Sequence, residues 1–490
     1  MIFEPSNPHL GSFDFHGTNV FGELHLDAAR SLLKLRTEDK PVHCSAPREL
    51  YGKFHDFNFV SCLDCVGGAE PNERFDSRGN SSYSWNLFPH FVVIGNRLFD
   101  PKNDKISSIY FSITDVSKIF DDFDSYGVVY DCPAQVLDMI PKSIGDRQVP
   151  HGPKPKLAYF AGRTDLLKVE VTDGCINVQH WPSFDMGSSE GIRLGSRLML
   201  SIDFSEPEEL TSCIGSVTRL LRFFSLVAGR TQSVSDIQIK VDGANERDLP
   251  LSLYWSLAPS VEHSEAETDE PSFRDMPLDA IRRPDEFANS LSSWWQESSA
   301  QKVARSRFHS CRERGNHFDV DRLIAAANMF DLRVSNGTAA IAPELARVCK
   351  ESVTALKELP NTDDRNEAIR ALKRVGQLSL RKKILIRADV VKSRFILADL
   401  DEVVQIAVQC RNHFVHGGGG RSFDYSVIEP YTVFLTETLE FIFGVAELID
   451  CGWDGAAWKS RSHTARHWFC RYLSGYSEHA TQLLLTSKKK

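Results

Sequence analysis

Residues 401–420 read DEVVQIAVQCRNHFVHGGGG, and this pattern predicts one amphipathic helix with a sharp end. Four apolar residues are spaced four, three and four apart, so they would form one buried stripe: Val403, Ala407, Cys410 and Phe414. Asp401 and Glu402 would lie in the first turn, where the helix dipole favours acidic side chains. Gly417–Gly420 predict an abrupt stop, because glycine readily takes the left-handed conformation that closes a helix.

The chain around this stretch has a helical pattern from about residue 276 onward. Seven segments carry apolar residues at three- and four-residue spacing: 286–305, 318–332, 343–358, 362–377, 400–415, 428–450 and 456–485. Pro343, Pro360 and Pro430 stand at or near their boundaries, where helix-breaking residues are expected. Residues 276–490 are therefore expected to form an all-α bundle with antiparallel neighbours.

Residues 1–258 have a different pattern, which predicts a β-rich domain. Short apolar runs alternate with turn signals and predict strands; examples are Phe57–Cys65, Phe88–Phe99, Ile106–Ile113, Leu167–Val171 and Leu198–Phe204. One helix, Glu208–Val227, is expected among them. Residues 259–275 are rich in acidic side chains with almost nothing to bury, and they predict a solvated linker. The expected fold class is α+β.

Charge is divided unevenly between the two parts. The formal net charge of the chain is −9, yet residues 301–490 hold 29 Lys+Arg against 22 Asp+Glu. The first 300 residues hold 28 Lys+Arg against 44 Asp+Glu. The basic part is therefore the one suited to an anionic partner such as RNA, although an excess of this size also fits ordinary surface charge.

The sequence predicts a cytoplasmic protein that does not enter a membrane. The apolar stretch Phe434–Ile449 is interrupted by Glu437, Glu440 and Glu447, which a membrane span would not tolerate. The first eight residues have neither the basic nor the apolar region of a secretory signal. Eleven scattered cysteines, an odd number, indicate reduced thiols.

The end of the helix over residues 401–416 groups side chains that can act on a phosphodiester. Asn412 and His416 are four residues apart and share a face, and the long Arg411 side chain can reach the same place. The helix dipole favours protonated histidine in the last turn, which suits His416 to general-acid chemistry. Arginine matches phosphate oxygens in a bidentate way. The RNA 2′-hydroxyl would be the nucleophile, so neither a metal nor another cofactor is expected.

Arg411-Asn412-His413-Phe414-Val415-His416, at a helix end within a late helical bundle, resembles the R-N-x-x-x-H signature of HEPN domains. The resemblance implies a helical bundle that pairs with a second copy, so that two motifs form one metal-independent ribonuclease cleft. It also implies a cyclic phosphate end. A second match to the spacing, Arg312–His317, lacks the Asn and contains Gly315-Asn316, so we interpret it as a chance match. The alternative is a helix end whose Arg411 and His416 only cap carbonyls and pair with acids.

Three short N-terminal motifs extend the resemblance to the whole chain: Phe21-Gly22-Glu23-Leu24, Leu50-Tyr51-Gly52-Lys53 and Val60-Ser61-Cys62-Leu63-Asp64-Cys65. Their order is similar to the N-terminal domain of ApeA-type anti-phage defence proteins, which join a β-rich sensor-like region to a C-terminal HEPN domain. The resemblance implies an abortive-infection effector. Such an effector would cut host or shared RNA, perhaps tRNA, once it senses a phage component.

Further residues are candidates for contact with RNA. His413 and Arg421 flank the motif, although His413 equally fits a surface or dimer-interface position. The stretch Arg365–Arg394 is dense in basic residues, including Lys382 and Lys383, and phosphate contacts supply most non-specific affinity. A solvated helix face paired with acids explains that stretch equally well.

Cys62 and Cys65 form a C-x-x-C within the predicted strand Phe57–Cys65. Residues three apart in a strand point to opposite faces, which favours packed thiols over a shared zinc ion. A zinc site would also need two more ligands, for which the nearby candidates are His43, Cys44 and Cys132.

The function that the sequence favours is an RNA endonuclease that works as a homodimer or higher oligomer in phage defence. His416 would be the general acid/base, Arg411 would stabilise phosphate charge, and Asn412 would orient His416 or the scissile group. The alternative is a non-catalytic interaction or sensor protein, in which a degenerate helical bundle only dimerises.

Overall fold

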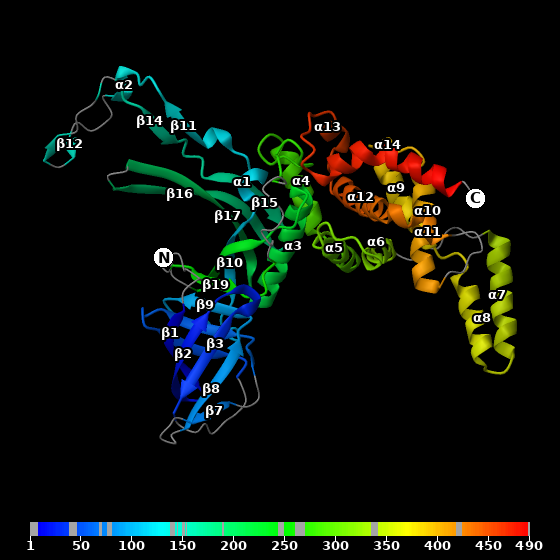
Figure 1. Ribbon diagram of the computed structural model, residues 1–490, viewed down its shortest axis with the longest axis horizontal. Coiled ribbons are helices and arrows are strands. Elements are labelled where there is room, and N and C mark those ends of the chain that lie inside the picture. Colours follow the sequence, from blue (N-terminus) through cyan, green and yellow to red (C-terminus); the bar gives the residue numbers. More distant parts are fainter. Residues whose placement is uncertain are drawn as a thin grey trace. The chain divides into compact units, whose positions relative to one another are not determined.

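The protein consists of two compact units in a computed structural model (Figure 1). One unit comprises residues 1–224, 232–268 and 279–288, and the other comprises residues 225–231, 269–278 and 289–490. The structure describes residues 8–38, 47–67, 71–75, 81–137, 143–144, 146–148, 152, 154–188, 191–243, 249–259, 270–334, 342–417 and 424–488. The predicted linker therefore lies largely outside the described residues, but Asp275 at its end is fully buried in the helical unit.

The first unit is built on an antiparallel sheet that has fifteen strands within the described residues. One half of the strand order is β15 (Asp165–Val171), β16 (Gly174–Ser188), β17 (Gly191–Glu208), β10 (Ile106–Ile113), β18 (Val234–Val241), β19 (Leu251–Trp255) and β9 (Phe91–Gly95). The order continues through β5 (Phe59–Leu63), β4 (Leu50–Phe54), β1 (His9–Phe15), β2 (Thr18–His25), β3 (Leu32–Thr37), β8 (Ser81–Phe88) and β6 (Val66–Gly67). β7 (Asn72–Phe75) pairs with β8 off this path.

Smaller elements complete this unit. β11 (Tyr126–Val129) pairs with β14 (Leu157–Phe160), and β12 (Ser143–Ile144) pairs with β13 (Arg147–Gln148). The short helices are η1 (Ala28–Arg30), α1 (Val116–Ile119), η2 (Phe123–Ser125) and α2 (Ala134–Leu137). The prediction of a β-rich region with an α+β fold is confirmed.

Two glycines from the short N-terminal motifs pack against one aromatic ring. Phe13 of β1 is fully buried and stands opposite Gly52 of β4. A Cβ atom added to Gly22 of β2 would lie 2.5 Å from the Phe13 ring, and one added to Gly52 would lie 2.6 Å from it. Since only a residue without a side chain fits there, these motifs bring β2 and β4 to the two sides of β1.

The predicted helix Glu208–Val227 is confirmed as α3, Leu210–Ala228. Its buried side chains recur at helical spacing: Cys213, Val217, Leu220, Leu221 and Phe224. By length and composition alone α3 could cross a membrane, a possibility that the sequence pattern did not indicate. However, 61% of its most apolar window is buried inside the protein, as in the core helix of a globular fold.

The second unit is helical. Its helices are α4 (Pro284–Trp295), α5 (Ser299–Arg312), α6 (Val320–Arg333), α7 (Pro343–Glu358), α8 (Asp363–Arg374), α9 (Leu380–Lys392), α10 (Leu400–His416), α11 (Tyr425–Ile428), η4 (Glu429–Tyr431), α12 (Thr432–Asp450), α13 (Gly455–Lys459) and α14 (Trp468–Ser487). α4 begins in the last residues of the first unit.

Two of the predicted helices are each divided in two, and one observed helix was not predicted. The predicted helix 286–305 is two helices, because a capping box starts α5: the Ser298 hydroxyl accepts a hydrogen bond from the Gln301 N–H, and the Ser298 N–H donates to the Gln301 side-chain oxygen. The predicted helix 456–485 is also two helices, α13 and α14. α9 falls within a basic stretch that had no predicted helix.

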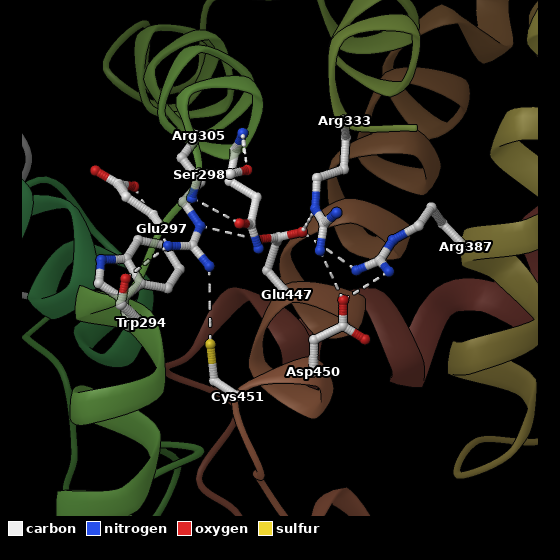
Figure 2. A network of polar contacts seen from close by, with 10 residues as sticks. Trp294, Glu297, Ser298, Arg305, Arg333, Arg387, Glu447, Asp450 and Cys451 are labelled. Carbon is white, nitrogen blue, oxygen red and sulfur yellow. Dashed lines mark hydrogen bonds and ion pairs between the residues drawn. The ribbon is translucent and has the colours of Figure 1, made fainter. Parts of the chain in front are cut away.

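α12 crosses the centre of the helical unit and carries two fully buried carboxylates. Glu447 lies among three guanidinium groups, at 2.8 Å from Arg305, 2.5 Å from Arg333 and 3.2 Å from Arg387 (Figure 2). Asp450, three residues later on α12, pairs with Arg333 and Arg387. These ion pairs join α5, α6 and α9 to α12.

Glu440, seven residues earlier on α12, forms a second such cluster. Both of its oxygens accept hydrogen bonds from Arg322 of α6, at 2.7 and 2.9 Å, and Arg312 of α5 adds a third at 3.1 Å. The two clusters therefore fix α6 at both ends.

Candidate active site

α10 ends as the sequence predicts. Its apolar stripe is buried at Val403, Ala407 and Cys410, whereas Phe414 is half-buried. Gly417 terminates the helix with a φ of 69°, and its N–H donates to the carbonyl of His413. This left-handed backbone conformation favours glycine and ends the helix, so His416 lies in its last turn.

The last turn of α10 brings together Arg411, Asn412 and His416. Nη1 of Arg411 donates to Oδ1 of Asn412 at 3.1 Å, and the same nitrogen lies 3.4 Å from Nε2 of His416. Asn412 and His416 are exposed, and Arg411 is half-buried. The three side chains are thus grouped at a surface that a substrate can reach.

A residue that was not predicted from the sequence holds Arg411 in place. Oδ1 of Asn328, on α6, accepts hydrogen bonds from Nε of Arg411 at 3.2 Å and from Nη2 at 2.9 Å. Asn328 stands within the run AAANMF, in which Ala326, Ala327, Met329 and Phe330 are buried. The only local signal for it was one amide in an otherwise apolar run.

The contact between Arg411 and His416 defines which atom can accept a proton. A guanidinium carries donors only, so Nε2 of His416 is the acceptor at this contact, and the ring hydrogen is then on Nδ1. An unprotonated Nε2 beside a permanent positive charge can take a proton from a hydroxyl group while the cation attracts an anion. The general-acid form expected from the helix dipole requires this contact to break.

The thiol beneath the motif is unsuited to chemistry. Cys410 is fully buried, and burial raises the pKa of its thiol to about 12. A thiol with such a pKa is protonated at neutral pH and is a poor nucleophile.

The structure places the residues predicted to contact RNA in different surroundings. The His413 ring stacks on Tyr425 of α11, with ring centroids 5.6 Å apart and an interplanar angle of 13°. Lys382 is exposed, whereas Lys383 is buried and its Nζ lies 3.2 Å from Asp331 of α6. Arg421 lies outside the described residues. RNA contact through His413, Lys382 or Lys383 stays a prediction, and Lys383 would first have to leave its ion pair.

The second match to the motif spacing has no shared helix face. Arg312 is the last residue of α5 and packs over the Trp468 ring at 4.3 Å, while it also pairs with Glu440. His317 lies beyond that helix with its side chain 75% exposed. Arg312 and His317 therefore do not form a common site, as expected of a chance match.

The C-x-x-C pair differs from its prediction. The strand ends at Leu63, and Asp64 has a φ of 50°, which turns the chain so that Cys62 and Cys65 enter the same buried cluster. The expectation that they point to opposite faces was therefore wrong. Burial raises the pKa of the Cys65 thiol to about 12, and the ten cysteines within the described residues are free. Of the candidate ligands, His43 and Cys44 lie outside the described residues.

Comparison with known proteins gives one kind of match. A family model described as ApeA N-terminal domain 1 matches residues 8–294, more than half of the 490 residues. The matched stretch contains the three short motifs around Gly22, Gly52 and Cys62. Neither a curated protein nor a solved structure matches the chain.

Proposed function

The chain belongs to the ApeA family of anti-phage defence proteins, and we propose that its helical unit is a metal-independent RNA endonuclease of the HEPN type. The observation that supports this proposal is the grouping of Arg411 and His416 at the exposed end of α10, with 3.4 Å between Nη1 and Nε2. At this distance, the histidine can take a proton from a 2′-hydroxyl while the guanidinium contacts the adjacent phosphate group.

The proposed reaction uses the RNA itself as the nucleophile. Nε2 of His416 takes the proton of the 2′-hydroxyl, and the 2′-oxygen attacks the adjacent phosphorus. The bond between phosphorus and the 5′-oxygen breaks, which leaves a 2′,3′-cyclic phosphate on one product. The departing 5′-oxygen receives a proton from His416 of a second copy of the chain in a homodimer or higher oligomer. Arg411 offsets the charge that develops on the phosphate oxygens, and Asn412 orients the guanidinium through its Oδ1.

In the cell, the protein would act as an abortive-infection effector in the cytoplasm. The β-rich unit would sense a phage component, and the helical unit would then cleave host or shared RNA, including tRNA. The basic balance of residues 301–490 is compatible with such a substrate.

The test uses the purified full chain and RNA in buffer without added divalent metal. We expect cleavage with cyclic phosphate ends, and we expect His416→Ala and Arg411→Ala to abolish it while their thermal unfolding stays unchanged. Arg347→Ala is a matched control, because Arg347 is exposed and, among the residues that the structure describes, pairs with Glu351 one turn along α7. If His416→Ala still cleaves RNA and still protects cells from phage, the assignment is wrong. Protection without cleavage in the wild type would instead support the non-catalytic interaction protein.

A further inference from the structure

The segment 270–278 is fixed inside the helical unit by two tryptophans. Nε1 of Trp453 donates to the carbonyl of Pro277 at 2.7 Å, and Nε1 of Trp458 donates to the carbonyl of Asp275 at 3.0 Å. These two hydrogen bonds fix the backbone next to Asp275, whose side chain is fully buried.

The loop that precedes α14 folds around the Asp275 carboxylate. Oδ1 accepts the Thr464 N–H at 2.5 Å, and Oδ2 accepts the Thr464 hydroxyl at 2.8 Å and the Arg466 N–H at 2.6 Å. Both oxygens of the Asp275 side chain thus act as hydrogen-bond acceptors, which is the pattern of an ionised carboxylate.

His463 turns an unpaired nitrogen toward this carboxylate. Nε2 of His463 lies 3.1 Å from the carbonyl of Trp458, which can only accept, so the ring hydrogen belongs on Nε2. Nδ1 is buried, makes no hydrogen bond and lies 3.8 Å from Oδ1 of Asp275. In the neutral ring two lone pairs then face each other, which is unfavourable unless a cation lies between them.

Cys470, in the first turn of α14, adds a third donor. Its side chain is buried, and its Sγ, Nδ1 of His463 and a carboxylate oxygen of Asp275 all lie within 4.8 Å of one another. Within the part of the chain that the structure describes, this is the group of three such ligands that meets this distance limit.

We propose that Asp275, His463 and Cys470 together bind one zinc ion. Nitrogen, oxygen and sulfur donors suit zinc, and ligands at 2.0–2.3 Å from a tetrahedral ion lie roughly 3.3–3.8 Å apart. The 3.8 Å between Nδ1 and Oδ1 already fits this spacing. The hydrogen bond from Nε2 to the Trp458 carbonyl is the kind of outer contact that orients a histidine ligand.

The ion has a structural role in this proposal. It joins segment 270–278 to the start of α14. With three protein ligands, the fourth tetrahedral position is left to water, as in zinc sites that keep an open position. The site shares no residue with Arg411, Asn412 and His416, so the proposed nuclease chemistry stays metal-independent. The competing account is a protonated His463 that forms an ion pair with Asp275 and needs no metal.

The experiment measures metal content in the purified full chain after dialysis, followed by replacement with cobalt. We expect about one zinc per chain, and an absorption band from sulfur to cobalt in the cobalt form. Cys470→Ser should remove that band. His463→Ala should weaken zinc affinity by more than the roughly 10–100-fold that loss of an outer contact costs, so this variant should retain little zinc after dialysis. Cys311→Ser is the matched control, because Cys311 is a buried thiol of the same unit that belongs to no such group within the described residues.

The outcomes separate the two accounts. Wild-type protein that retains no zinc and gives no sulfur-to-cobalt band overturns the proposal and leaves the ion pair as the explanation. The same holds if His463→Ala and Cys470→Ser retain as much zinc as Cys311→Ser. The zinc content of the wild-type protein alone distinguishes the zinc site from the ion pair, so the test remains valid even if a variant fails to fold. RNA cleavage does not enter the readout.

Discussion

A single oxygen, Oδ1 of Asn328, holds two nitrogens of the Arg411 guanidinium, Nε at 3.2 Å and Nη2 at 2.9 Å. The third nitrogen, Nη1, is thereby directed to Asn412 and His416. The guanidinium is rigid and planar, so fixing two of its nitrogens fixes the place of the third. Asn328 is a positioning residue in the proposed reaction, since it acts through Arg411.

Asn328→Ala should lower kcat of the proposed RNA cleavage by about 10²-fold, because the guanidinium loses its fixed place beside His416. Asn328→Asp keeps an oxygen that can accept from Arg411, so its kcat should be close to that of the wild type. If Asn328 only stabilised the fold, kcat would not depend on this oxygen. Asn366→Ala is the control, since Asn366 of α8 is half-buried and its side-chain amide donates to Asn361, the neighbouring partner that the described part of the chain gives it. Steady-state kinetics of the three variants would check this, and equal rates for wild type and Asn328→Ala would contradict it.

Local features of the chain were predictable from the sequence, as α10 illustrates. Its predicted bounds, 400–415, differ from the observed ones by one residue, because an apolar stripe and a glycine stop are both local signals. The break between α4 and α5 also had a local signal, the capping pair Ser298 and Gln301, which the periodicity concealed.

Features that depend on distant partners were not predictable. α9 was missed because buried Lys383 and Arg387 interrupt its apolar pattern, and their partners lie on α6 and α12. Asn328 could not be linked to Arg411, because nothing local indicates a contact across 83 residues. The strand order of the sheet is non-local in the same way, since β10 lies between β17 and β18.

Glu447→Ala should destabilise the helical unit by about 3–5 kcal/mol, because three buried or half-buried guanidiniums would lose a shared counter-charge. The matched control is Glu351→Ala, which removes an exposed partner of Arg347 and should change stability by less than about 0.5 kcal/mol. Thermal or denaturant unfolding monitored by circular dichroism would measure both. Similar losses from the two variants would show that the cluster in Figure 2 adds no stability.

The same carboxylate should make the helical unit sensitive to acid. Burial acts to raise the pKa of Glu447, but Arg305, Arg333 and Arg387 outweigh it and lower that pKa below the ordinary value of 4.5. A carboxylate whose pKa is lowered by folding contributes its full stability above its unfolded pKa, and this is lost as pH falls through the folded pKa. The difference in unfolding free energy between wild type and Glu447→Gln should therefore shrink below about pH 4.5. A difference that stays constant from neutral pH to about pH 3 would contradict the shift.

One chemical change, glycine to alanine, should have opposite effects at two places in the β-rich unit. A Cβ at Gly52 would lie 2.6 Å from both the Phe13 ring and the backbone oxygen of Ser12, so β1 and β4 would have to separate. Overpacking of this kind costs about 1–3 kcal/mol. Gly215 is exposed on α3 with nothing within 4 Å of its added Cβ, so Gly215→Ala should stabilise by roughly 0.5–1 kcal/mol through helix propensity.

Hydrogen exchange of the full chain can measure each effect where it arises. Gly52→Ala should speed exchange of the amides that pair β1 with β4, at Gly11–Asp14 and Tyr51–Phe54. Gly215→Ala should leave the exchange rates of those amides unchanged. It should slow exchange within α3, because the substitution reduces the conformational freedom of this segment in the unfolded chain. If both variants shift exchange in the same direction, the Phe13 contact is not what requires glycine at position 52, and the place of β4 beside β1 must depend on other packing.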